Sequence, residues 1–109
     1  MAKDVEFVDN ALDDLRNFPV DARREAGFQI DKVQNGLDPD DWKPMGTVGP
    51  GAREIRIREA SGAFRVIYVA TFREAVYVLH CFRKTSEQTE QRDIDLAARR
   101  YRKAKEMAR

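Results

Sequence analysis

Apolar residues recur at two different spacings in the first 40 residues. A run from Val5 to Val8 alternates with period two, which predicts a short first strand. After Asp9 and Asn10, which can cap a helix, the spacing becomes three and four residues. This predicts two short helices that Pro19 separates and Gly36 ends, packed as an antiparallel hairpin. Their apolar positions are Ala11, Leu12, Leu15 and Phe18 in the first helix, and Ala22, Ala26, Ile30, Val33 and Leu37 in the second.

Strand patterns dominate the second half of the chain. The segment from Trp42 to Gly51 is dense in glycine and proline, which predicts an irregular connector. Residues 54–58 then alternate, while residues 64–70 and 75–82 are apolar on both faces, as central strands covered on two sides are. A last helix is predicted after Thr85 or Thr89, either of which could cap it. The order predicts an α+β fold: a three-strand antiparallel meander with a short N-terminal strand, packed with the helical hairpin and the C-terminal helix.

Length and composition are those of one globular domain. With 109 residues the chain has room for one hydrophobic core, so we expect a single domain over residues 1–109. The longest apolar run, Ala75 to Phe82, is too short to cross a bilayer, and the N-terminal residues lack an apolar secretory signal. A single cysteine, Cys81, and a single histidine, His80, predict a reduced cytoplasmic protein without a metal or cofactor. We interpret Cys81 and Trp42 as packing residues.

Charge is distributed unevenly along the chain. Residues 1–49 contain six Lys/Arg and eleven Asp/Glu, whereas residues 50–109 contain fourteen Lys/Arg and eight Asp/Glu. Such asymmetry is a hint of an anionic partner. The alternative is that part of the surplus lies on the solvated face of the terminal helix, on Arg99, Arg100, Arg102, Lys103, Lys105 and Arg109. The arginines in the predicted strands are then the part of the positive surplus that this alternative does not explain.

Four segments of the second half resemble the RelE/ParE toxin superfamily, and within it the phage-derived HigB-like branch. They are W-K-P-M, E-I-R-I-R, G-A-F-R-V-I-Y and V-Y-V-L-H-C-F-R-K-T, in this order and spacing. With the helical hairpin, the resemblance covers essentially the whole chain. It implies a toxin of a type II toxin–antitoxin module that enters the decoding site of the ribosome and cuts mRNA there as a metal-independent endoribonuclease. The implied partners are the ribosome, mRNA and a cognate antitoxin, which in this branch usually has a helix-turn-helix fold.

The same superfamily also contains proteins with other activities. Its ParE branch inhibits DNA gyrase and has no nuclease activity, and a phage-derived relative could keep only an antitoxin-binding surface. Convergence of Arg65, Lys84 and His80 on one concave basic patch would favour the nuclease, whereas a pocket without convergent cations would favour the inhibitor. Several family members use a tyrosine near the C-terminus at the nucleotide. Here Tyr101 lies on the apolar stripe of the last helix, and we interpret it as a core residue.

Cleavage of RNA by its own 2′-hydroxyl needs a proton acceptor, cations for the charge that develops on the phosphate, and a proton donor for the leaving 5′ oxygen. Arg65 is the first candidate, because a guanidinium held beside Ile67 and Val69 is costly to desolvate unless it meets an anion. The resemblance also implies a phosphate-binding arginine at this position. The alternative is a structural ion pair with a carboxylate.

Two further residues are catalytic candidates. Lys84 matches a position at which many relatives have a catalytic or phosphate-contacting cation, and the alternative is a solvated lysine. His80 has an unperturbed pKa near neutrality and could act as a general base. It is placed on one face with Val76, Val78 and Phe82, however, where a core role is the alternative.

The remaining cations are candidates for RNA binding. Arg56 and Arg58 lie two residues apart, so they point to the same side of a strand, about 7 Å from each other. They could bind successive phosphates, or they could pair with Glu54 or Glu59 on a solvated face. Arg83, after the last strand, and Lys43, in the W-K-P-M segment, complete the set of expected RNA contacts.

Overall fold

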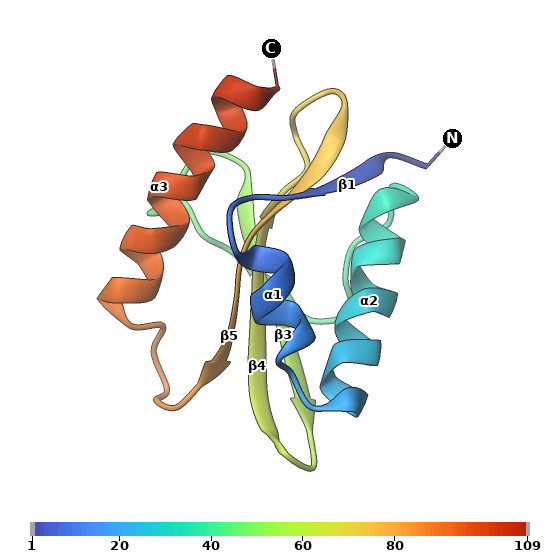
Figure 1. Ribbon diagram of the computed structural model, residues 1–109, viewed down its shortest axis with the longest axis vertical. Coiled ribbons are helices and arrows are strands. Elements are labelled where there is room, and N and C mark those ends of the chain that lie inside the picture. Colours follow the sequence, from blue (N-terminus) through green and yellow to red (C-terminus); the bar gives the residue numbers. More distant parts are fainter. Residues whose placement is uncertain (1, 109) are drawn as a thin grey trace.

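The protein, seen here as a computed structural model that describes residues 2–108, has one five-stranded sheet with helices on both faces (Figure 1). The strands are β1 (Asp4–Phe7), β2 (Trp42–Pro44), β3 (Ala52–Glu59), β4 (Gly62–Val69) and β5 (Ala75–Lys84). The helices are α1 (Ala11–Arg16), α2 (Val20–Gln34) and α3 (Gln91–Met107). This arrangement confirms the predicted α+β class.

The strands lie in the order β1-β5-β4-β3-β2. The strand β3 pairs with β2 and with β4, and β4 pairs with β5, all in antiparallel orientation. This confirms the predicted meander of β3, β4 and β5. The strand β1 pairs with β5 in parallel. The irregular connector was predicted to span residues 42–51, but its first three residues form β2 at the edge of the sheet. Pro44 ends this strand, because proline has no N–H for a further ladder bond and is tolerated at an edge. The addition of β2 matters for function because it brings Lys43 opposite Glu54.

The predicted hairpin of α1 and α2 covers one face of the sheet (Figure 1). Its apolar stripe packs on the side chains of β3, β4 and β5 that point to this side, among them Ile55, Val66 and Val78. The helix α2 ends as predicted: Gly36 has a φ of +81°, and the amide of Leu37 donates to the carbonyl of Lys32 over 2.9 Å. This geometry is a common helix ending that favours glycine.

The helix α3 covers the opposite face and forms a second core. Tyr101 is buried in it, with its ring 5.6 Å from that of Phe72 and its hydroxyl donating to the Pro50 carbonyl over 2.6 Å. A Cβ at Gly49 would lie 2.6 Å from the Tyr101 ring, so only glycine fits under it. Tyr101 is therefore a core residue, as predicted.

The start of α3 differs from the prediction. Glu90 occupies the N-cap position without a side-chain hydrogen bond, so neither Thr85 nor Thr89 caps the helix. The hydroxyl of Thr89 instead donates to Glu54 of β3 over 2.7 Å. A contact between positions 35 residues apart has therefore replaced the local cap that the sequence favoured.

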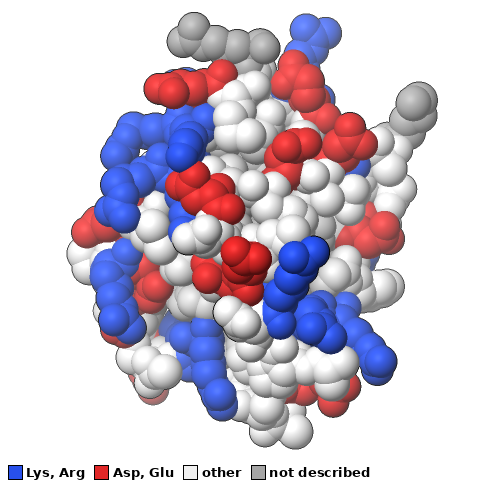
Figure 2. Space-filling view, in the orientation of Figure 1, with Lys and Arg blue, Asp and Glu red and all other residues white. Residues whose placement is uncertain are grey.

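Figure 2 shows acidic side chains across the middle of this view of the molecule, and basic side chains along the left edge, where α3 lies, and at the lower right. Arg99, Arg102, Lys103 and Lys105 of α3 are exposed, as the solvated-helix interpretation expects. Arg100 is an exception: it is buried and donates to the Leu79 carbonyl over 2.9 Å. Arg109 lies outside the described residues. Across residues 2–108, the helices are all too short or too polar to span a membrane.

Candidate active site

The register of strands β2 to β5 places five of the predicted cations on one face of the sheet. Lys43 lies opposite Glu54, and Arg56 lies opposite Arg65. Paired residues on neighbouring strands point to the same side. Ala63 has two partners across the strands, Arg58 on β3 and Lys84 on β5. We call Lys43, Arg56, Arg58, Arg65 and Lys84 the basic cluster. It lies on the α3 side, because Arg65 alternates with Ile67 and Val69 of the second core.

A buried carboxylate lies among these cations. Glu54 has an exposed fraction of 0%. Its Oε1 lies 3.5 Å from Arg65 Nε and 3.8 Å from Lys43 Nζ, and its Oε2 accepts the hydrogen bond from Thr89. The ion pair that was the alternative interpretation of Arg65 is thus present. The five cations of the basic cluster nevertheless outnumber their acidic partners among the described residues, which are Glu54 for Arg65 and Lys43 and Asp41 for Arg56.

Arg65 is held rigidly at the base of the cluster. It is 6% exposed, and its Nη1 donates to the Phe64 carbonyl over 3.0 Å. Burial is the main cause of a lowered pKa for Arg65, and the charges of Arg56 and Arg58 act in the same direction while Glu54 opposes them. A guanidinium with several cationic neighbours and little water is stabilised when an anion enters the site.

Lys84 lies on the same sheet face as Arg65, at the end of β5, and is half-buried. Burial lowers the pKa of its amine, the charges of Arg65, Lys43 and Arg56 lower it further, and Glu54 counteracts them. An ammonium group with a lowered pKa releases its proton more readily than a solvated lysine does. Lys84 is therefore suited to donate a proton to a leaving oxygen.

Arg56 and Arg65 form a like-charged pair directly across two strands. Such pairs are destabilising. Among the described residues, Asp41 is the only acidic side chain within ion-pair distance of Arg56, at 3.9 Å, and exposed ion pairs of this kind contribute little. The fold therefore keeps an electrostatic arrangement that a bound phosphate would relieve.

His80 does not join the basic cluster. A bulge between β4 and β5 pairs Ile67 with His80 but Tyr68 with Val78, so the alternation of side chains along β5 is reset there. Val76 and Val78 consequently face α1 and α2, and the prediction that His80 shares their face is wrong. His80 Nε2 lies 2.8 Å from Asp93 Oδ1 on the first turn of α3. Its ring also stacks on Phe82, with centroids 4.7 Å apart.

The environment of His80 makes the stability of the protein depend on pH. Burial lowers its pKa below 6.5, and the bond to Asp93 opposes this only in part. The unfolded chain therefore takes up a proton before the folded protein does, and stability is lost as the pH falls below the unfolded value of about 6.5. Between pH 6.5 and 5, we expect the free energy of unfolding to fall by at most about 1.4 kcal/mol per pH unit from this group. Urea titrations should show this slope, and His80→Gln should flatten it; an equal slope in the variant would contradict the assignment.

Arg83 is separated from the other predicted cations. It lies opposite Phe64, whose side chain points toward α1 and α2, and its guanidinium is 5.5 Å from the Phe64 ring. It also donates to the Ser61 carbonyl. The sheet thus lies between Arg83 and the basic cluster.

Two residues of the site were not identified as functional from the sequence. Glu54 was considered only as a partner for the strand arginines, although its alternation with Arg56 and Arg58 already placed it on their face. Its burial depends on β2 and on the segment before α3, which no local pattern reveals. Thr89 was considered only as a cap, because its contact with Glu54 is long-range.

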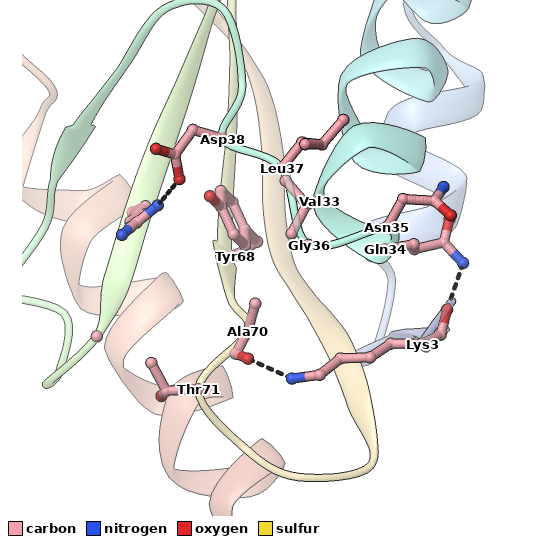
Figure 3. Close-up of a pocket in the computed structure, with 12 residues that line it drawn as sticks. Lys3, Val33, Gln34, Asn35, Gly36, Leu37, Asp38, Tyr68, Ala70 and Thr71 are labelled. Carbon is pink, nitrogen blue, oxygen red and sulfur yellow. Dashed lines mark hydrogen bonds and ion pairs between the residues drawn. The ribbon is translucent and has the colours of Figure 1, made fainter. Parts of the chain in front are cut away.

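A hollow of about 350 Å³ lies elsewhere, beside the end of α2 (Figure 3). Its lining includes Asp38, Arg53 and Tyr68 but no member of the basic cluster. Its charged groups are already paired: Arg53 donates to Asp38 over 2.9 Å, and Lys3 donates to the Ala70 carbonyl over 2.6 Å. No group of three or more His, Cys, Asp or Glu side chains in residues 2–108 is placed to hold a metal ion. The basic cluster is therefore the better candidate site.

Comparisons with known proteins agree with this fold. The structure is similar to that of a doubly substituted variant of the E. coli toxin RelE in the free state, with a TM-score of 0.69 and 19% identity over 92% of this chain and 98% of that chain. This similarity confirms the expected RelE-like fold. No curated protein sequence matches the chain. Residues 13–102 match the family described as "Phage derived protein Gp49-like". The chain therefore belongs to the Gp49-like family of phage-derived proteins.

Proposed function

We propose that the protein is the toxin of a type II toxin–antitoxin module, of the HigB-like branch, and that it cuts mRNA on the ribosome without a metal ion. The convergence of Arg65 and Lys84 with Lys43, Arg56 and Arg58 on one sheet face carries this proposal. A sheet face on which five cations converge suits phosphodiester cleavage better than protein binding. The RelE-like fold and the Gp49-like family membership support a toxin.

The reaction that fits this site is attack of a ribose 2′-oxygen on the adjacent phosphorus, with the 2′-hydroxyl proton passing to solvent water, because we assign no described side chain as its acceptor. The bond from phosphorus to the 5′ oxygen breaks, which leaves a 2′,3′-cyclic phosphate and a 5′-hydroxyl end. We assign Arg65 to the non-bridging phosphate oxygens, where negative charge grows in the transition state. Lys84 would supply the proton that the leaving 5′ oxygen takes up. Glu54 is fully enclosed, so its role is to orient Arg65 and Lys43.

Substrate binding is assigned to the outer members of the basic cluster. Arg56 and Arg58 are exposed and alternate along β3, so they could contact successive phosphates of one strand. Lys43 is half-buried at the edge formed by β2 and would contact the RNA backbone. His80, which is engaged with Asp93, is reassigned from catalysis to the support of α3.

Primer extension on mRNA after induced expression of the protein tests the proposal. We expect discrete cleavages inside translated codons and none when translation is blocked before induction. A neighbouring gene for a helix-turn-helix antitoxin should relieve the growth arrest when it is co-expressed. Arrested growth with intact mRNA would contradict the nuclease and favour a ParE-like inhibitor. Normal growth with intact mRNA would favour a protein that keeps only an antitoxin-binding surface.

A substitution of Arg56 should change the thermal stability of the protein and its RNA binding in opposite directions. Replacing it by glutamine removes the repulsion with Arg65 across the strands, which is worth about 0.2–1 kcal/mol. We therefore expect Arg56→Gln to raise the melting temperature by about 1–5 °C and to weaken RNA binding. Thermal unfolding followed by circular dichroism and cleavage assays at several salt concentrations would measure both effects. A variant that is less stable than the natural protein would show that Arg56 has a structural role instead.

A further inference from the structure

We propose that Thr89 is a positioning residue of the site, which fixes Arg65 and Lys43 through the carboxylate of Glu54. The inference rests on the proposed function, because it assigns Thr89 a part in the cleavage reaction. Thr89 itself does not touch the RNA in this proposal. It connects the segment before α3 to the middle of the sheet.

The contacts of Glu54 define this connection. Thr89 Oγ1 donates to Oε2 over 2.7 Å, and Oε1 faces Arg65 Nε at 3.5 Å and Lys43 Nζ at 3.8 Å. Oε1 and Arg65 Nε are both buried and have no hydrogen-bond partner among the described residues. The hydroxyl of Thr89 is therefore the direct hydrogen-bond donor that fixes the rotation of this carboxylate. The rotation of the carboxylate determines the position of Oε1, which attracts Arg65 and Lys43.

Thr89 also lies in the segment that joins the end of β5 to the start of α3, close in sequence to Lys84. The residues between β5 and α3 have no helical or strand structure, and Lys84 is the last residue of β5. A bond from this segment to β3 holds the start of α3 beside the basic cluster. Loss of the hydroxyl would leave Oε2 buried without a donor, which is costly for a carboxylate. Glu54 would then turn toward other donors, and Arg65 would shift with it.

A displacement of this kind should slow the chemical step more than it weakens substrate binding. Among the described residues, Thr89 forms no hydrogen bond with Arg56, Arg58 or Lys84, so most of the phosphate-binding charge stays in place. Misplacement of a reacting group by about 1 Å can lower a rate by up to about 100-fold. We expect Thr89→Val to lower the cleavage rate at saturating toxin by about 10-fold, with a half-saturating concentration close to that of the natural protein.

Single-turnover cleavage of mRNA on purified ribosome complexes measures both quantities. Thr89→Ser keeps the hydroxyl and should retain the natural rate within about twofold. Thr85→Val is the matched control, because Thr85 is exposed in the same segment and has the same side chain. It should leave both quantities unchanged. A rate for Thr89→Val equal to that of Thr85→Val would overturn the proposal, as would a slow Thr89→Ser variant.

Nuclear magnetic resonance gives a readout that does not depend on cleavage. The buried Arg65 Nε–H should give a side-chain signal that exchanges slowly with water, identified by its absence in Arg65→Lys. We expect this signal to shift or broaden in Thr89→Val and to remain in Thr89→Ser and Thr85→Val. An unchanged signal in Thr89→Val would overturn the proposed connection. A changed signal in a protein that cuts no mRNA would support the connection while rejecting the proposed function.

Discussion

Replacing Arg65 by alanine is expected to lower the rate of the proposed mRNA cleavage by about 10²–10³-fold, as removal of one preorganised donor to a developing oxyanion does in other enzymes. Arg65 is 6% exposed, and its guanidinium is held by the Phe64 carbonyl and by Glu54 on the face where the other cations converge. Its position is therefore set before the substrate arrives. Arg65→Lys should recover little of the rate, because an ammonium group cannot offer two parallel donors to a phosphate.

The matched control for this experiment is Arg83→Ala. Arg83 is also an arginine of the meander, but the sheet separates it from the basic cluster. We expect its replacement to leave the cleavage rate within about threefold of the natural rate. Primer extension and single-turnover kinetics would measure both variants, and circular dichroism would verify that they are folded. Natural rates for Arg65→Ala, or equal losses for both variants, would contradict the assignment of Arg65.

The sequence predicts most of the fold because its patterns are local. Residues 64–70 and 75–82 are apolar on both faces, and the structure covers both strands with helices on each side. The strand β2 could not be predicted in the same way. It is three residues long, lies among glycines and prolines, and exists because β3 offers it an open edge.

The candidate site could be predicted only where alternation along a strand decides which side chains share a face. Alternation correctly predicted that Arg56 and Arg58 point to the same side of their strand, and that Arg65 shares a face with Ile67 and Val69. It failed for His80, because a bulge one residue long reverses the alternation along β5 and has no sequence signature here. It also failed to reveal that Glu54 is buried, since that depends on β2 and Thr89, which approach from distant parts of the chain.

The position of the Glu54 carboxylate bears on the stability of the whole sheet. The face below α3 is apolar where the helix covers it and cationic beside the start of the helix. An apolar side chain at position 65 could be buried at a lower free-energy cost than the charged side chain of arginine. The carboxylate of Glu54 offsets part of the cost of burying the Arg65 guanidinium. The site is thus an electrostatic exception within an otherwise apolar pair of central strands. Its stability should depend strongly on keeping Glu54 and Arg65 together.

Replacing Glu54 by leucine should consequently destabilise the protein by about 3–5 kcal/mol, because it leaves the buried Arg65 guanidinium without its carboxylate. The double variant Glu54→Leu/Arg65→Leu should regain most of this loss, since apolar side chains can replace a buried ion pair without a net cost. Urea unfolding of the natural protein, the two single variants and the double variant forms a complete cycle. A double variant as unstable as Glu54→Leu would show that the carboxylate stabilises the sheet by another route, through Lys43 or Thr89. A loss of less than about 1 kcal/mol in Glu54→Leu would mean that water reaches Arg65 and that its burial is less complete than the structure indicates.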